Sequence, residues 1–226
     1  MKYGESTFDV LYLLFAIISG IIIVIKSKKR EHLLMGIASI VLGCGDAFHL
    51  VPRVINYFIE ADMNLYLGIG KLVTSVTMTI FYVILYYVWI GFYKEEKNKK
   101  VELLVWILAA LRIGACAFAQ NGWFENENNL TWSIIRNVPF VILGVIIMCL
   151  YYLNRNENKT FRFVWLYILL SFAFYIPVAI GAMFVPMLGM LMLPKTICYI
   201  LLIVAFIIQV FKDEKKESID GGNIDE

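Results

Sequence analysis

The chain has 226 residues, of which 61% are hydrophobic and 17% are charged, against about 45–50% and about 25% in a soluble domain. A water-soluble fold of this size cannot hide so much apolar surface, so the excess must face lipid, and a soluble globular class is excluded. The net charge is only +2, so the position of each charge matters more than the sum, and we expect no nucleic-acid partner.

Seven apolar stretches follow one another along the chain, each long enough to cross roughly 30 Å of hydrocarbon as a helix of about 20 residues. The predicted spans are 8–26, 33–53, 66–92, 101–120, 132–153, 162–184 and 188–211. The sequence therefore predicts an all-α, polytopic membrane protein, a seven-transmembrane-helix bundle formed by a single domain at 1–212. The charged, glycine-containing tail at 213–226 is predicted to be disordered.

Basic residues cluster in alternate connecting segments, whereas the loops around 60–62 and 120–131 contain no Lys or Arg. The clusters follow the first, third, fifth and seventh spans: Lys26, Lys28, Lys29 and Arg30; Lys94, Lys97, Lys99 and Lys100; Arg155, Lys159 and Arg162; Lys212, Lys215 and Lys216. Since basic loops are cytoplasmic, this pattern predicts an N-terminus outside and a C-terminus in the cytoplasm, in a multi-pass protein of the cell membrane. Acidic Glu5 and Asp9 precede the apolar run of this span and the basic cluster follows it, so we interpret the span as retained rather than as a cleaved signal peptide.

The cysteines and histidines carry no metal or redox signature. Four cysteines lie inside apolar runs without CxxC or Cys/His spacing, which is typical of small buried hydrophobic residues: Cys44, Cys116, Cys149 and Cys198. Only His32 and His49 occur, which excludes a three-histidine zinc site. We expect neither a metal nor a cofactor.

Ionisable residues inside the predicted spans are the main functional signal. They are Asp46, His49, Arg53, Lys71, Arg112, Arg136 and Lys195. A charge near the bilayer centre costs about 2.5–3.5 kcal/mol on insertion scales, so each such residue is a candidate for function. The predicted direction of each span places all of them in the outer half of the membrane, where they would share one layer.

Two helical faces contribute to this layer. On the second span the spacing of Asp46, His49 and Arg53 is i, i+3 and i+7, which puts them on one face. The third span carries a similar stripe made of Lys71, Thr74, Ser75, Met78 and Tyr82. Facing each other, the two stripes would form a basic, hydroxyl-lined chamber.

Two structural interpretations compete with a binding site. Arg53 and Arg136 lie near span ends, where long basic side chains can extend to the interface. Asp46 can pair with one cation purely for stability. That pairing would still leave five cations and a histidine facing one carboxylate, so either some lysines are neutral or the missing anion is a ligand.

A family resemblance rests on about forty residues. The stretch Gly45-Asp46-Ala47-Phe48-His49-Leu50-Val51-Pro52, followed by Gly70 and by Thr79-Ile80-Phe81-Tyr82 on the next span, resembles the bacterial lysoplasmalogenase-like membrane family. Thr79 stands where that family has a histidine, and a second intramembrane aspartate is missing. The resemblance implies a hydrolase that cleaves the vinyl ether bond of a lysophospholipid, with Asp46 as the matching acid.

The residues themselves point in a compatible direction. A basic cavity with apolar walls suits an anionic amphiphile such as a membrane lipid, or another anionic small molecule, with Arg53, Lys71, Thr74, Ser75, Tyr82, Arg112, Arg136 and Lys195 as the substrate-binding set. Asp46 and His49 are the candidate catalytic pair for general acid/base chemistry in a lipid hydrolase. The alternatives are a transporter or receptor for a small organic anion and, more remotely, a photoreceptor. The span count and Lys195 on the last span resemble microbial rhodopsins, but Lys71 stands on the third span, where these carry an acidic counterion.

Overall fold

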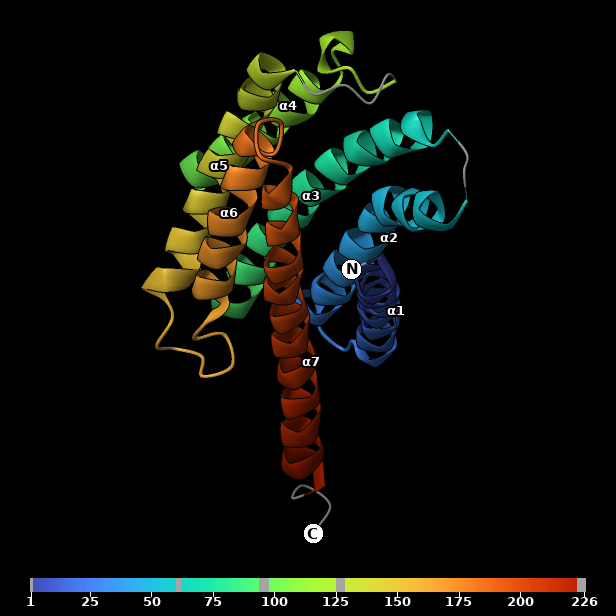
Figure 1. Ribbon diagram of the computed structural model, residues 1–226. Coiled ribbons are helices and arrows are strands. Elements are labelled where there is room, and N and C mark those ends of the chain that lie inside the picture. The colour runs from blue at the N-terminus through green and yellow to red at the C-terminus, as the bar shows by residue number, and fades with distance from the viewer. Residues whose placement is uncertain (1, 60–61, 94–97, 125–128, 223–226) are drawn as a thin grey trace.

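The computed structural model describes residues 2–59, 62–93, 98–124 and 129–222, and within these ranges every regular element is helical (Figure 1). The elements are α1 (Lys2–Lys26), α2 (Arg30–Phe58), α3 (Asn64–Tyr93), α4 (Lys99–Cys116), the 3-10 helix η1 (Ala119–Asn121), α5 (Leu130–Leu153), α6 (Val164–Gly181), the 3-10 helix η2 (Pro186–Leu191) and α7 (Met192–Gly222). The predicted all-α class is thereby confirmed. The predicted loop positions at 60–61, 94–97 and 125–128 lie outside the described residues.

Six of the described helices are long and apolar enough to cross a membrane, which makes the chain a multi-pass membrane protein. These spans are Tyr3–Lys26, Arg30–Phe58, Asn64–Tyr93, Leu130–Leu153, Val164–Gly181 and Met187–Ile219. Helix α4 is not among them: it has 18 residues and includes Lys99, Lys100, Glu102 and Arg112. Whether the chain crosses the membrane six or seven times therefore depends on whether α4 is a span.

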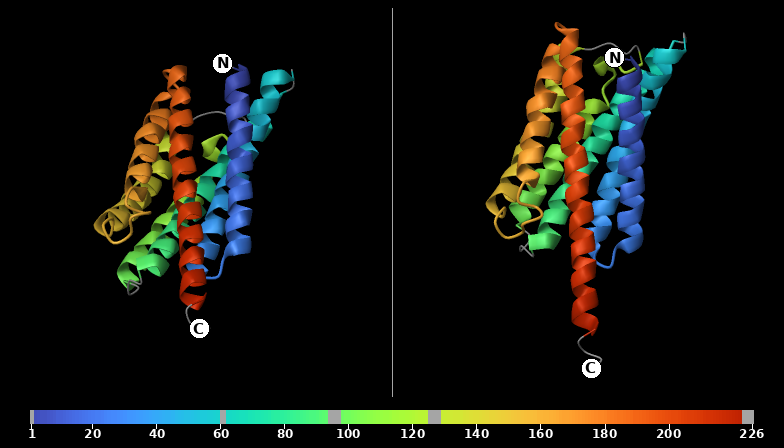
Figure 2. Two further views of the ribbon diagram at one scale, coloured as in Figure 1. Left: turned by 90° about the horizontal axis from the view of Figure 1, so that it is seen from below. Right: turned by 60° about the horizontal axis from the view of Figure 1, so that its bottom comes forward.

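Consecutive helices pack as neighbours around a ring, and α7 closes it by contacting both α1 and α2. Helix α3 also contacts α5, which puts it nearest the middle of the bundle. The helices run roughly along one common direction, and the two termini lie at opposite ends of the bundle (Figure 2). The polar residues near the start of α1 therefore lie at the same end of the bundle as the second half of α2 and the start of α7.

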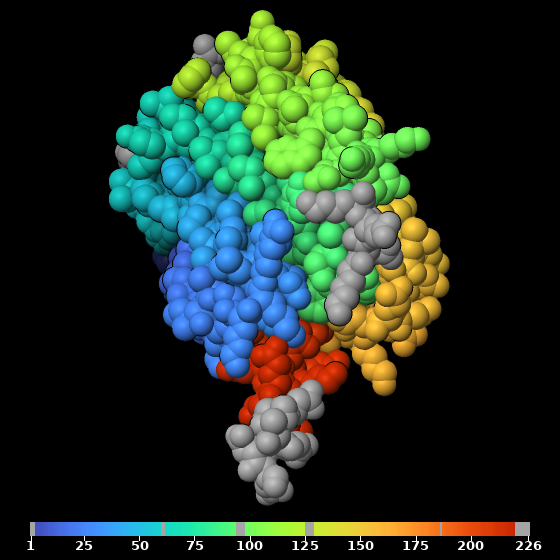
Figure 3. Space-filling view, turned by 180° about the vertical axis from the view of Figure 1, so that it is seen from behind, coloured from blue at the N-terminus to red at the C-terminus, as the bar shows by residue number. Residues whose placement is uncertain are grey.

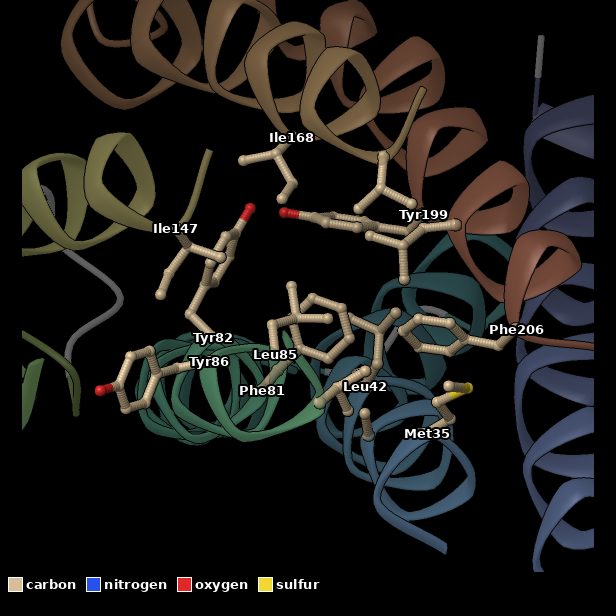
Figure 4. Packing of buried hydrophobic residues seen from close by; sticks show 14 of the residues in the cluster. Met35, Leu42, Phe81, Tyr82, Leu85, Tyr86, Ile147, Ile168, Tyr199 and Phe206 are labelled. Atoms are coloured by element: carbon tan, nitrogen blue, oxygen red, sulfur yellow. The ribbon is translucent and has the colours of Figure 1, made fainter. Parts of the chain in front are cut away.

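Aromatic side chains fill the middle of the bundle. Tyr82 of α3 packs edge-on against Phe140 of α5, with ring centroids 5.3 Å apart, and Phe81 packs edge-on against Tyr199 of α7 at 5.9 Å. The hydroxyls of Tyr82 and Tyr199 point toward each other near Ile168 (Figure 4). Such edge-to-face contacts add stabilisation beyond the buried area. These rings form a packed aromatic layer next to the polar site residues.

Helix α4 ends earlier than predicted. The fourth span was expected to reach residue 120, but α4 stops at Cys116 and η1 follows. Asn121 Nδ2 donates to the carbonyls of Ala115 and Phe118, at 2.8 and 2.9 Å, and Trp123 Nε1 donates to the carbonyl of Cys116 at 2.8 Å. These bonds satisfy carbonyls that a helix end leaves unpaired, and so they stabilise the early end.

The predicted disordered tail from residue 213 is wrong for residues 213–222, where α7 continues as a helix to Gly222; residues 223–226 are not described. Asp213 Oδ2 lies 3.0 Å from His32 Nε2, and Glu214 pairs with Lys26 at 2.9 Å. Glu217 pairs with Lys29 at 3.0 Å, and their hydrogen bond raises the pKa of Lys29. The C-terminal part of α7 therefore packs against the α1–α2 turn (Figure 3), because acidic residues of the tail meet basic ones of that turn.

The cysteines divide into two groups. Cys116 and Cys198 are buried as predicted, whereas Cys44 and Cys149 are exposed on the outside of the bundle. The prediction was wrong for the second pair because an apolar run does not reveal which helix face turns toward lipid.

Candidate functional site

Most of the predicted site residues line one cavity of about 280 Å³, which lies between α2, α3, α4, α5, α6 and α7. The predicted residues found in its wall are His49, Arg53, Lys71, Thr74, Ser75, Arg112, Arg136 and Lys195. Arg53 contacts the first turns of α1, so this basic cavity opens toward the end of the bundle where the chain begins. The cavity wall brings together residues of both polar stripes, although Asp46 and Tyr82 do not line it; the role of the stripes in binding stays a prediction.

A second, smaller pocket adjoins the basic cavity. Its volume is about 40 Å³, and it is lined by Asp46 and Asp9 together with His49, Arg53 and Lys195, which belong to both walls. A space of that size holds a water molecule or two but no larger ligand. Asp46 therefore lies beside the basic cavity rather than in it, and we call this space the Asp46 pocket.

Helices α2 and α3 approach closely at the site because Gly70 has no side chain. A Cβ at Gly70 would lie 2.7 Å from His49 Cα and would also meet the Phe48 carbonyl. Thr74 Oγ1 donates to the carbonyl of Gly45 at 3.0 Å, across the same interface. The close contact between α2 and α3 thus fixes the backbone position of His49. The Nδ1 atom of His49 is buried and has no hydrogen-bond partner among the described residues.

Asp46 is held by a residue that the sequence analysis missed. The hydroxyl of Tyr12, which is only 1% exposed, donates to Asp46 Oδ2 at 2.7 Å. A signal for Tyr12 exists in the sequence, because Glu5, Asp9 and Tyr12 follow the spacing i, i+4 and i+7 and so share one face of α1. That face turns toward α2 and completes the Asp46 pocket.

The assumption of a single carboxylate in the charged layer was wrong. Arg53 forms ion pairs with Glu5 and with Asp9, the latter at 3.2 Å between Nη2 and Oδ2, and Tyr57 donates to Glu5 at 3.1 Å. Glu5 and Asp9 had been assigned to the segment before the first span, whereas both lie within α1. Arg53 is thus paired with two carboxylates of α1.

Among the described residues, the arginines on the α4–α5 side have only neutral partners. Arg112, 1% exposed, donates from Nη1 to the Arg136 carbonyl at 2.7 Å and to Asn137 Oδ1, and its guanidinium lies 4.3 Å from the Phe140 ring centroid. Arg136 donates to Asn121 Oδ1 at 2.7 Å and lies 4.5 Å from the centroid of Trp123. Amide oxygens and aromatic faces stabilise these cations without cancelling their charge.

Lys195 also packs against aromatic rings, but it lines the Asp46 pocket as well, where its charge interacts with that of Asp46. Its side chain is 6% exposed, and Nζ lies 5.0 Å from the Tyr175 ring centroid and 5.5 Å from that of Tyr199. Within the described ranges, no ion pair joins Arg112, Arg136 or Lys195 to a carboxylate. Uncompensated charge in a low-dielectric interior is costly, so this side of the basic cavity is suited to an anion.

Tyr82 is the one predicted substrate-binding residue that lies outside both pockets. It is fully buried beneath them, and its hydroxyl lies 3.3 Å from Ser171 Oγ. The stripe on α3 reaches the cavity only as far as Met78, because one further helical turn carries Tyr82 into the aromatic core. Three cavity residues that the sequence analysis did not select, Trp123, Asn137 and Tyr175, are neutral side chains without a distinctive pattern.

The described residues contain no cluster of three or more His, Cys, Asp or Glu side chains that could hold a metal ion. Comparison with known proteins finds no matching family model, no matching curated protein and no matching solved structure. The resemblance to lysoplasmalogenases therefore stays a prediction.

Replacing Arg53 with Gln is expected to destabilise the protein because it leaves Glu5 and Asp9 without their cation. Removing one partner of a buried ion pair costs roughly 3–5 kcal/mol. Partial exposure of the Arg53 and Glu5 side chains, 21% and 26%, favours the lower end. The free energy of unfolding in detergent measures the effect.

The matched control is Arg30→Gln, an exposed arginine at the other end of α2, which should unfold like the wild type. Adding Asp9→Asn to Arg53→Gln should restore part of the loss, since one buried charge disappears. Equal stability of the Arg53 and Arg30 variants would show that the ion pairs contribute nothing.

Proposed function

We propose that the protein binds an anionic amphiphile whose head group occupies the basic cavity. The observation that carries the proposal is a set of two buried cations, Arg112 and Lys195, and one half-buried cation, Arg136, none of which forms an ion pair with a carboxylate among the described residues. Buried charges are normally paired, so their retention inside a membrane bundle favours a ligand that supplies the anion. The hydroxyls of Thr74 and Ser75 also line the cavity, but each donates its proton to a backbone carbonyl, so the cations are the groups that would bind head-group oxygens.

The proposal includes a seven-span topology with the N-terminus outside. At 1.5 Å per residue, the 18 residues of α4 extend about 27 Å, close to the roughly 30 Å of the hydrocarbon core. Helix α4 also packs between α3 and α5, and an odd number of crossings agrees with termini at opposite ends (Figure 2). In this topology the basic cavity lies in the outer half of the bilayer.

Cysteine labelling tests the topology. In a cysteine-free background, Asp62→Cys in the segment between α2 and α3, which lies on the same predicted side as the N-terminus, should react with a membrane-impermeant maleimide on intact cells. Ser218→Cys near the end of α7 should react only after permeabilisation. Both positions are exposed, so access is decided by the side of the membrane. The reverse pattern would place the cavity in the cytoplasmic half, and labelling of both on intact cells would contradict seven spans.

Binding is tested by native mass spectrometry or microscale thermophoresis with a monoacyl phosphate lipid, compared with the uncharged monoacylglycerol of the same chain. We expect the phosphate lipid to bind more tightly. Since a hydrogen bond to a charged group contributes about 1.5–3 kcal/mol, Arg136→Gln or Lys195→Gln should weaken its binding about ten- to hundredfold.

Lys159→Gln serves as the control for binding, because Lys159 is exposed on the loop before α6 and far along the chain from the cavity. It should leave the affinity unchanged. Equal affinity for the charged and the uncharged lipid would contradict an anionic ligand.

A second candidate function, lipid hydrolysis, is favoured by the Asp46 pocket. A water-sized space next to a carboxylate, sharing His49 and Lys195 with the basic cavity, suits a hydrolytic water next to a bound head group. In this mechanism Asp46, oriented by Tyr12, exchanges a proton with the water or the substrate. The resemblance noted above implies a vinyl ether lysophospholipid as the substrate.

Hydrolysis is tested by incubating the purified protein with a panel of lysophospholipids that includes vinyl ether lipids, with products read by mass spectrometry. Asp46→Asn should abolish turnover but preserve lipid binding. Asp62→Asn changes an exposed carboxylate before α3 and should have no effect. Binding without turnover across the panel would rule out the hydrolase and leave a binding or transport role.

A further inference from the structure

A second large depression lies on the outside of the bundle, between α5 and α6. This α5–α6 groove has a volume of about 250 Å³. Six aliphatic side chains form most of its wall: Ile134, Val138, Val141, Ile142, Ile176 and Ile180. Along α5 it extends from Ile134 to Ile142, which at 1.5 Å per residue is about 12 Å. Its shape is therefore that of a slot parallel to the helices.

The groove and the basic cavity share a wall. Asn137, Tyr175 and Ala179 line both spaces. Two hydrogen bonds cross between the helices at this wall: Tyr175 donates from its hydroxyl to Asn137 Oδ1 at 2.7 Å, and Ser133 Oγ donates to the Ala179 carbonyl at 3.1 Å. The apolar slot is thus separated from the cationic side of the cavity by one layer of side chains.

The residues along the slot face the membrane. Val138 is 50% exposed, and Ile180 is 46% exposed. In a bilayer such a face is covered by hydrocarbon, so the natural occupant of the groove is a lipid chain. A chain here has its polar end next to Asn137, whose Oδ1 also accepts from Arg112. The apolar groove and the cationic cavity together match the two ends of one amphiphile.

We propose that the α5–α6 groove is the acyl-chain subsite of the bound amphiphile and its entrance from the surrounding lipid. The inference rests on the proposed function, because it requires a head group in the basic cavity. The ligand class is then a single-chain lipid with an anionic head group, which passes between α5 and α6 without leaving the membrane. The Tyr175–Asn137 hydrogen bond lies across this path and opens for the head group to pass.

The test separates chain binding from head-group binding by varying the chain alone. The probes are glycerol phosphate, which has no chain, and glycerol phosphate acylated with hexanoyl, dodecanoyl or hexadecanoyl chains. Ile142→Trp fills the groove from a position that is 44% exposed. Val145→Trp is the matched control, because Val145 lies one turn further along α5, is 48% exposed and does not line the groove.

We expect Ile142→Trp to weaken binding of the dodecanoyl and hexadecanoyl lipids about tenfold and to leave glycerol phosphate unaffected, with Val145→Trp like the wild type for every probe. A photoreactive diazirine at the chain end should label peptides from α5 or α6.

Three results would overturn the inference. If Ile142→Trp binds the long-chain lipids like the wild type, or the diazirine labels other helices, the chain lies elsewhere while head-group binding stands. If both tryptophan variants weaken every probe alike, the effect is a general one on the fold. If the wild type binds none of the probes, the proposed function fails, and the inference fails with it.

Discussion

A charged side chain inside hydrocarbon must be paired or hydrogen-bonded. This requirement determines which residues meet at the end of the bundle that contains the basic cavity. Arg53 forms ion pairs with two carboxylates of α1, and Asp46 accepts a hydrogen bond from the hydroxyl of Tyr12. Arg112 and Arg136 donate hydrogen bonds to amide and carbonyl oxygens and lie over aromatic rings. Every one of these contacts joins two helices or a helix and its neighbouring loop, so the same interactions that make the charges tolerable also hold the helices around the cavity.

The site therefore has two sides with different electrostatics. Toward α1 the charges compensate each other, and a water-sized pocket lies beside Asp46. Toward α4 and α5 the positive charge of Arg112 and Arg136 is stabilised by neutral groups among the described residues, and the apolar groove lies just outside this side. The proposed proton transfer and the proposed anion binding would therefore take place in two adjoining pockets. The ring contacts among Phe81, Tyr82 and Tyr199 form a packed aromatic layer in the middle of the bundle, next to the site.

The opposite end of the bundle is fixed by charge as well. The last turns of α7 carry Asp213, Glu214 and Glu217 onto the basic turn between α1 and α2, where buried His32 joins them. Exposed ion pairs contribute little individually, but here several of them together connect the C-terminal part of α7 with the α1–α2 turn. Helix α7 is thereby held at both ends, with Lys195 in the basic cavity at one and Asp213 at the other.

The sequence by itself determined the all-helical membrane class of the protein and six of its apolar helices, because apolar length and helical period are local properties. It also predicted that Arg53, Lys71, Arg112, Arg136 and Lys195 would meet. Only the tertiary structure decided their partners. Glu5 and Asp9 neutralise Arg53, Tyr82 lies in the core, and the acidic end of α7 remains helical, since each outcome depends on which face of one helix meets another. Composition and spacing describe a single helix; the pairing of charges is a property of the contacts between helices.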